Sequence, residues 1–183
     1  MERSQHQTQR LTRLVQDLLD AHRLHTGKFS LDVLPVQLDE LVLRVAETAQ
    51  AMTTSQEIRV EVTTAPVIVN GDAGRLEQAL MNLVTNALTY APQSQRIEVR
   101  LTRIGAEALA QVRDYGPGIA PSEVSHLTER FYQVMRTDSD RTARRGLGLG
   151  LFIVSEIVAG HGGRLEVRRW WTRERRSLYV CPC

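Results

Sequence analysis

Three glycines alternate with leucines where a predicted apolar helix begins. The segment Gly146-Leu147-Gly148-Leu149-Gly150-Leu151 leads into a helix expected over 149–159, which the run Gly160-His161-Gly162-Gly163 ends. Backbone N–H groups at a glycine-rich helix start form an anion site that the helix dipole favours. Arg144 and Arg145 stand directly before it, where they could meet a triphosphate. Walker-type and Rossmann patterns do not fit, because the Gly-Lys-Ser/Thr run and the βαβ context are missing.

Two asparagines lie on a long helix that the sequence predicts from a cap at Asp72 to about Tyr90. Asn82 and Asn86 are four residues apart, so their side chains project from one face. An amide oxygen is a suitable ligand for Mg²⁺. Water and phosphate oxygens normally supply the other ligands of this ion. Taken alone, the pair is better explained as tying down a neighbouring loop.

A carboxylate followed by two glycines comes directly after a predicted strand, in Asp114-Tyr115-Gly116-Pro117-Gly118-Ile119. Such a carboxylate can accept a hydrogen bond from an exocyclic amine, the group that distinguishes adenine from other purines. The glycines permit a tight turn and close approach of the backbone to a ligand. An ordinary Asp-Gly turn is again the better explanation of this motif alone. The order of the three motifs is much more specific than any one of them.

The remaining pattern alternates helices and strands, as in an α/β domain. The region 115–147 lacks strong periodicity, which is typical of a functional lid or of disorder. The expected elements are an extended segment over 29–38, a helix from a cap at Asp39 to about Thr53, strands over 57–63 and 67–69, a turn at Asn70-Gly71, a hairpin of 96–102 and 108–113 through Gly105, a short helix over 121–130 and a strand over 164–168.

An amphipathic helix is predicted over residues 9–24. Its apolar stripe needs a partner, and the alternative is that it folds back onto the rest of the chain. The stripe consists of Leu11, Leu14, Val15, Leu18, Leu19 and His22.

Composition excludes several classes of protein. The 183 residues carry a net charge of +2, too small to indicate a nucleic-acid partner. No run approaches the roughly 20 apolar residues of a membrane-spanning helix. Cys181 and Cys183 have no second pair, so no metal site is expected of them, and a cytoplasmic location is predicted.

Residues 39–168 resemble the catalytic ATP-binding domain of bacterial sensor histidine kinases. This domain belongs to an ATPase superfamily shared with gyrase, MutL and the ninety-kilodalton heat-shock chaperone. The resemblance rests on four motifs: Asn82–Ala87 is similar to the N box, Asp114–Ile119 to the G1 box, Phe131-Tyr132 to the F box and Gly146–Leu151 to the G2 box.

The resemblance implies a two-layer α/β sandwich of the Bergerat type, with a mixed sheet and ATP bound between helices and a lid. By position, Asn86 resembles the principal Mg²⁺ ligand, Asn82 its partner and Asp114 the adenine-reading carboxylate. The other implied ATP-binding residues are Tyr90, Gly116, Gly118, Arg144, Arg145, Gly146, Gly148 and Gly150. Thr89 stands where the family usually has a basic residue that contacts phosphate, so Arg144 or Arg145 is expected to take that task.

The implied activity is transfer of the γ-phosphoryl group of Mg-ATP to a histidine in two-component signalling. Asn82 stands where hydrolytic relatives have a general-base Glu, which favours a transferase. Residues 1–28 resemble the second helix of the dimerisation and phosphoacceptor domain, and residues 29–168 form the ATP-binding domain.

The first helix and the H box of that domain are absent, so self-phosphorylation by this chain is not expected. The expected partners are a phosphoacceptor helix or a second kinase subunit, and a response regulator. A longer parent protein would form a homodimer and could be membrane-anchored. The alternative is a non-catalytic nucleotide-binding regulatory module that docks through its N-terminal helix.

Residues 169–183 form a basic tail that is atypical of the family. We hypothesise that the last fourteen residues arise from a frameshifted reading of a Gly-rich turn and closing strand, with Tyr179-Val180 imitating that strand. A tail that binds a partner or a membrane surface is the alternative. Sequencing of the gene tests the hypothesis, which fails if no single-base change restores the usual ending.

Overall fold

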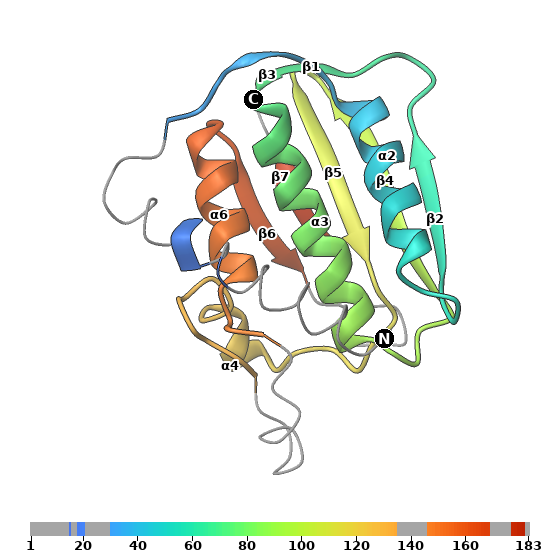
Figure 1. The fold of residues 1–183 in the computed structure, drawn as a ribbon, viewed down its shortest axis with the longest axis vertical. Coiled ribbons are helices and arrows are strands. Elements are labelled where there is room, and N and C mark those ends of the chain that lie inside the picture. The colour runs from blue at the N-terminus through green and yellow to red at the C-terminus, as the bar shows by residue number, and fades with distance from the viewer. Residues whose placement is uncertain (1–14, 16–17, 21–29, 135–145, 169–176, 182–183) are drawn as a thin grey trace.

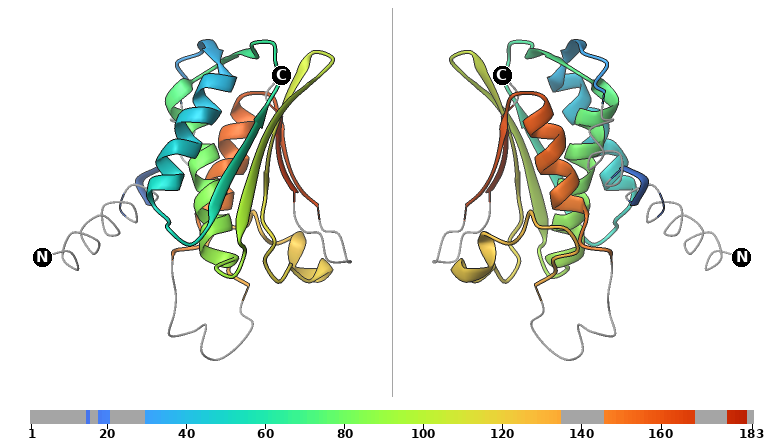
Figure 2. Two further views of the ribbon diagram at one scale, coloured as in Figure 1. Left: turned by 90° about the vertical axis from the view of Figure 1, so that its right-hand side faces the viewer. Right: turned by 90° about the vertical axis from the view of Figure 1, so that its left-hand side faces the viewer.

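The described part of the chain forms two layers, a sheet and three helices that cover one of its faces (Figure 1, Figure 2). The computed structural model describes residues 15, 18–20, 30–134, 146–168 and 177–181. The elements are β1 (Leu34–Gln37), α2 (Leu38–Ala51), β2 (Glu57–Val62), β3 (Ile68–Gly71), α3 (Ala73–Tyr90), β4 (Arg96–Ile104), β5 (Glu107–Arg113), α4 (Pro121–Val124), α6 (Gly150–Gly160), β6 (Arg164–Arg168) and β7 (Ser177–Cys181).

The sheet is mixed, as expected. Its strand order is β2-β4-β5-β7-β6, with β2 and β4 parallel and every other neighbouring pair antiparallel. Strands β1 and β3 form a separate two-stranded antiparallel ribbon. The tail residues that were expected to imitate the closing strand do so, because β7 lies between β5 and β6.

Alternation along the strands separates a buried face from a charged face. Ile97, Val99 and Leu101 of β4 are buried against the helices, whereas the residues between them are partly or fully exposed. Helices α3 and α6 supply the opposite side of the core through Leu80, Leu83, Val84, Ile153 and Ile157. The sandwich thus leaves one sheet face outside the core, away from the helices (Figure 2).

Three local predictions are wrong. Helix α2 begins at Leu38 after Gln37, and Asp39 lies within its first turn, where its carboxylate accepts a hydrogen bond from the N–H of Val67 at 3.0 Å. Residues Asn70-Gly71 belong to β3 because they pair with Pro35 and Leu34, so ladder pairing overrides local turn preference.

The third wrong prediction is the helix expected over 121–130, because α4 ends at Val124. Four-residue turns follow it, with the N–H of His126 bonded to the carbonyl of Glu123 and that of Glu129 to the carbonyl of His126. Ser122, Ser125 and Thr128 are weak helix formers, which explains why the helix does not continue.

The predicted cap at Asp72 is confirmed. Its carboxylate accepts hydrogen bonds from the N–H groups of Arg75 at 3.0 Å and Asp32 at 3.1 Å. Burial tends to raise the pKa of Asp72, but these N–H groups and the charge of Arg75 outweigh burial and lower the pKa below its ordinary value.

An Asp72→Ala variant is therefore expected to lose about 1 kcal/mol of unfolding free energy at neutral pH. Because the folded pKa lies below the unfolded one, the advantage of the wild type is complete above the unfolded pKa, 3.8. It disappears as the pH falls through the lower, folded pKa. Denaturant titrations of both proteins from pH 7 to pH 3 measure this, and a difference that stays constant over the range would contradict it.

Within the described N-terminal residues, the buried carboxylate of Asp20 contacts the sandwich. Residues 15 and 18–20 are helical, and the rest of the helix predicted over 9–24 lies outside the described residues. Asp20, only 1% exposed, accepts hydrogen bonds from Arg75 at 3.1 Å and Gln78 at 2.7 Å on α3. Among the described helices, none is both long and apolar enough to cross a membrane.

Candidate functional site

Asp114 lies directly after β5 and points toward the helix layer. The inward residues of β5 are Ala108, Ala110 and Val112, and the two-residue period of a strand continues to Asp114, which is 5% exposed. Its Oδ1 accepts a hydrogen bond from the N–H of Gly116 at 2.7 Å. The fold therefore places Asp114 directly after a strand, as the sequence predicts, and in addition buries its carboxylate.

The turn after Asp114 contacts the end of α3 through Gly116. A Cβ atom on Gly116 would lie 2.7 Å from the Cβ of Ala91 and 2.8 Å from Asp114 Oδ1. The carbonyl of Ala91 accepts hydrogen bonds from the Gln56 side chain at 2.8 Å and the Ser94 N–H at 2.9 Å. Only glycine allows this approach at position 116, and Gly118 has a φ of 78° that also favours glycine.

The asparagine pair faces the start of α6. The Asn82 side chain donates a hydrogen bond to the carbonyl of Gly150 at 3.5 Å. A Cβ atom on Gly150 would lie 3.7 Å from Nδ2 and 3.8 Å from Oδ1 of Asn86, in van der Waals contact. Asn82, Asn86 and Gly150 therefore lie close together.

The amide of Asn86 suits a hard cation. It is half-buried, and within the described residues it forms no hydrogen bond. The described residues also contain no group of three or more His, Cys, Asp or Glu side chains that could hold a metal ion. An amide oxygen is one of the hard ligands that Mg²⁺ accepts, together with water and phosphate oxygens.

The glycine-rich segment is held against Phe131-Tyr132. The N–H of Phe131 donates to the carbonyl of Gly148 at 3.1 Å, and the Gln133 side chain donates to the carbonyl of Gly146 at 2.7 Å. Gly148 has a φ of 71°, and Phe131 has a φ of 64°, which a bulky side chain rarely adopts. These bonds join the two sides of the segment 135–145.

Helix α3 connects the parts of the site. Asn82 and Asn86 lie along it, and Ala91 at its end touches the turn after Asp114. Tyr90, predicted to bind ATP, is the last residue of α3 and 46% exposed. Arg144 and Arg145 lie outside the described residues, so their predicted roles stay predictions.

Sequence reasoning missed the part that Ala91 plays in the site, since Ala91-Pro92 indicates only where a helix stops. It also missed Tyr115, whose side chain lies on the outer sheet face. The available signal was an aromatic residue beside the carboxylate, together with Arg96, Glu98 and Arg113 at alternating strand positions.

Comparison with known proteins decides the family. Residues 71–177 match the family described as histidine kinase-, DNA gyrase B- and HSP90-like ATPase. The chain belongs to this family. Its matched region contains Asn82, Asn86, Asp114 and the glycine-rich segment.

Relatives that are similar to this chain include sensor proteins. The chain is 34% identical over 169 residues to the phosphate regulon sensor protein PhoR of Pseudomonas aeruginosa, covering 91% of this chain and 38% of that protein. It is 35% identical over 168 residues to the probable sensor histidine kinase TcrY of Mycobacterium tuberculosis, covering 91% and 34%. The chain spans about a third of the length of the curated relatives it matches.

Solved structures agree with the fold and the family. A mycobacterial sensor histidine kinase, MprB, matches with a TM-score of 0.70 and 32% identity, covering 82% of this chain and 96% of that one. Full-length ShkA in complex with AMPPNP matches with a TM-score of 0.77 and 29% identity, covering 94% and 35%. The chain therefore contains the ATP-binding domain that these sensor histidine kinases share.

Proposed function

We propose that this chain binds Mg-ATP and transfers its γ-phosphoryl group to a histidine on a dimerisation helix. The observation that carries the proposal is the arrangement along α3, with a buried carboxylate beside one end and a paired amide face farther back. Asn82 and Ala91 are nine residues apart, or roughly 13 Å along a helix axis. This separation suits an elongated ligand that carries a base at one end and phosphates at the other.

Asp114 would accept a hydrogen bond from the adenine 6-amino group. Its Oδ1 is held by the N–H of Gly116, so the carboxylate is oriented before any ligand arrives. The absence of a Cβ atom on Gly116 keeps the turn close to Ala91 and therefore fixes the carboxylate relative to α3. Orientation in advance lowers the entropy cost of binding.

Asn86 would hold Mg²⁺ through its amide oxygen, with Asn82 one helical turn earlier. Bound Mg²⁺ would neutralise phosphate charge during phosphoryl transfer. The Asn82 amide bonds the carbonyl of Gly150, which holds the asparagine face against the start of α6. The N–H groups in the first turn of α6 would then meet phosphate oxygens, because they have no partner within the helix.

The catalytic machinery would work mainly by positioning. Asn82 is a neutral amide and cannot take a proton from water as a general base would. Transfer to a histidine, rather than hydrolysis, is therefore the reaction that these residues favour.

Neither of the two histidines that the structure describes would be the acceptor histidine. His161 is buried, with Nδ1 2.7 Å from the carbonyl of Ile157 and Nε2 accepting from the N–H of Asp72 at 2.9 Å. His126 bonds Glu129 at 2.7 Å. The folding role of His161 explains its place after α6, since it joins α6 to the start of α3.

A phosphoacceptor helix would pack on the N-terminal helix. Val15, Leu18 and Leu19 are 56%, 51% and 46% exposed, so their apolar surface is not covered by the described sandwich. Asp20 fixes the end of this segment to α3 and leaves those three residues outside. A homodimer of the longer protein, and a response regulator that receives the phosphoryl group, complete the proposal.

Incubation with γ-labelled ATP, Mg²⁺ and a separate phosphoacceptor hairpin tests the transfer. The proposal predicts acid-labile, alkali-stable label on a histidine of the hairpin, and at least a tenfold lower initial rate for Asp114→Asn at subsaturating ATP, since that hydrogen bond involves a charged group. Nucleotide binding without any transfer would instead support the regulatory module.

A further inference from the structure

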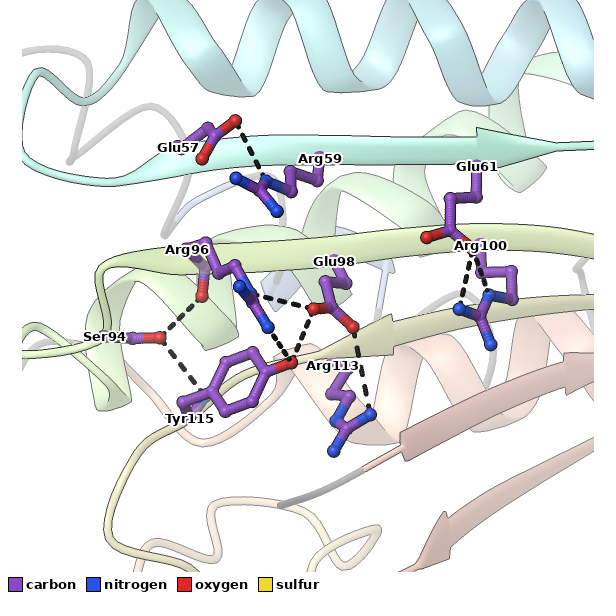
Figure 3. Close-up of polar contacts among 9 residues, drawn as sticks. All are labelled: Glu57, Arg59, Glu61, Ser94, Arg96, Glu98, Arg100, Arg113 and Tyr115. Atoms are coloured by element: carbon purple, nitrogen blue, oxygen red, sulfur yellow. Dashed lines mark hydrogen bonds and ion pairs between the residues drawn. The ribbon is translucent and has the colours of Figure 1, made fainter. Parts of the chain in front are cut away.

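A polar cluster surrounds Tyr115 on the sheet face that lies away from the helices (Figure 3). We call Tyr115, Arg96, Glu98 and Arg113 the Tyr115 cluster. The Tyr115 hydroxyl donates to Glu98 Oε1 at 2.5 Å and accepts from Arg96 Nη2 at 3.1 Å. The guanidinium carbons of Arg96 and Arg113 each lie 5.0 Å from the centre of the tyrosine ring. Two cation–π contacts and two hydrogen bonds therefore fix this ring in place.

Ion pairs connect the cluster across two strands. Arg96 Nε lies 2.9 Å from Glu98 Oε1, and Arg113 Nη1 lies 3.9 Å from Glu98 Oε2. Glu98 and Arg113 are directly paired residues of β4 and β5. Burial tends to raise the pKa of Glu98, but the Tyr115 hydroxyl and the two guanidinium groups lower it below the ordinary value, so Glu98 is charged at neutral pH.

The backbone of Tyr115 is held as well. Its N–H donates to Ser94 Oγ at 3.2 Å, and Ser94 Oγ donates to the carbonyl of Arg96 at 2.6 Å. The N–H of Ser94 donates to the carbonyl of Ala91, which is the residue that touches Gly116. One chain of contacts thus links the outer cluster, the end of α3 and the turn after Asp114.

Tyr115 and Asp114 are adjacent and face opposite sides of the sheet end. Asp114 is buried on the helix side, whereas Tyr115 lies in the cluster on the other side. A rotation of the backbone that moves one side chain must move the other.

We propose that Tyr115 is a positioning residue that sets the orientation of Asp114 and so the preference for a purine with a 6-amino group. The inference rests on the proposed function, because it assumes that Asp114 reads adenine. It adds a specificity determinant that lies outside the ligand site and acts through the strand end.

Competition between ATP and inosine triphosphate tests this directly, because the latter carries a 6-oxo group in place of the 6-amino group. The measured quantity is the dissociation constant for inosine triphosphate divided by the dissociation constant for ATP. This ratio is expected to fall roughly fivefold in Tyr115→Ala, since a small displacement of a binding group has a large cost. Tyr115→Phe removes both hydrogen bonds of the hydroxyl, and Glu98→Gln removes the charge that pairs with Arg96 and Arg113. Each variant should lower the ratio about threefold. These two variants keep the test available if Tyr115→Ala does not fold.

Glu61→Gln is the matched control. Glu61 pairs with Arg100 at 2.6 Å on the same sheet face but does not touch the Tyr115 cluster (Figure 3). Its ratio should equal that of the wild type. A general loss of protein stability would weaken the binding of both nucleotides equally and leave the ratio unchanged. The ratio therefore distinguishes an effect on the position of Asp114 from an effect on stability.

A second comparison uses Asp114→Asn. If Tyr115 acts through Asp114, adding Tyr115→Ala to Asp114→Asn should leave the ratio as Asp114→Asn sets it. An unchanged ratio in all three Tyr115 and Glu98 variants, alongside a lowered one in Asp114→Asn, would overturn the inference alone. An unchanged ratio in Asp114→Asn would overturn the adenine assignment and the inference with it.

Discussion

Asp114→Asn is expected to weaken ATP binding roughly ten- to hundredfold while the fold persists. The carboxylate is buried, and the N–H of Gly116 orients it directly after β5. A carboxamide can still accept the Gly116 hydrogen bond, which preserves the turn. A carboxamide has only one acceptor oxygen and no charge, so the hydrogen bond with the adenine base is the interaction that is weakened.

Titration calorimetry with ATP and Mg²⁺ measures the loss, and circular dichroism checks the fold. Asp32→Asn is the matched control, because it makes the same chemical change at an exposed carboxylate. Equal affinities in the wild type and Asp114→Asn would show that Asp114 does not read the base.

Gly148→Ala is expected to have the largest effect on the glycine-rich segment. At its φ of 71°, a Cβ atom would lie 2.6 Å from the carbonyl oxygen of Tyr132 and 2.8 Å from the carbonyl carbon of Phe131. Both atoms are backbone, so neither can rotate away. Backbone strain and steric overlap together are expected to cost about 2–4 kcal/mol. Either the unfolding free energy falls by this amount, or the glycine-rich segment separates from Phe131-Tyr132.

Gly146→Ala provides the control for stability. A Cβ atom on Gly146 would meet nothing within 4 Å. The φ of Gly146 is also not among the positive φ values of the described glycines. Its unfolding free energy should therefore lie within about 0.5 kcal/mol of the wild type. Denaturant unfolding of both variants measures the contrast, and similar unfolding free energies for the two would contradict a requirement for glycine at 148.

Much of the helix layer could be predicted because local rules decide it. Asp72 caps α3 as a short polar side chain before a helix should, and Gly105 turns the hairpin of β4 and β5 with a φ of 62°. The strands over 96–102 and 108–113 were likewise predicted, and they form β4 and β5 with alternating burial. The motifs, which need only order and spacing, predicted the family that the comparisons confirm.

Contacts between distant segments account for what the sequence could not predict. Asn70-Gly71 has the composition of a turn, yet pairing with β1 makes it a strand. The contact between Ala91 and Gly116 joins residues 25 positions apart, and no local pattern at Ala91 indicates it. The Tyr115 cluster likewise depends on the register between β4 and β5, which only the folded sheet establishes.

Calorimetric titration of the wild-type chain with ATP, in the presence and absence of Mg²⁺, tests the central claim most directly. That claim is that Asp114, the asparagine pair on α3 and the glycine-rich start of α6 form one nucleotide site. We expect one saturable site per chain, with an affinity that falls when Mg²⁺ is chelated, because amide oxygens and phosphates would share the cation. Folded protein that releases no heat and shows no saturable binding under either condition would contradict it.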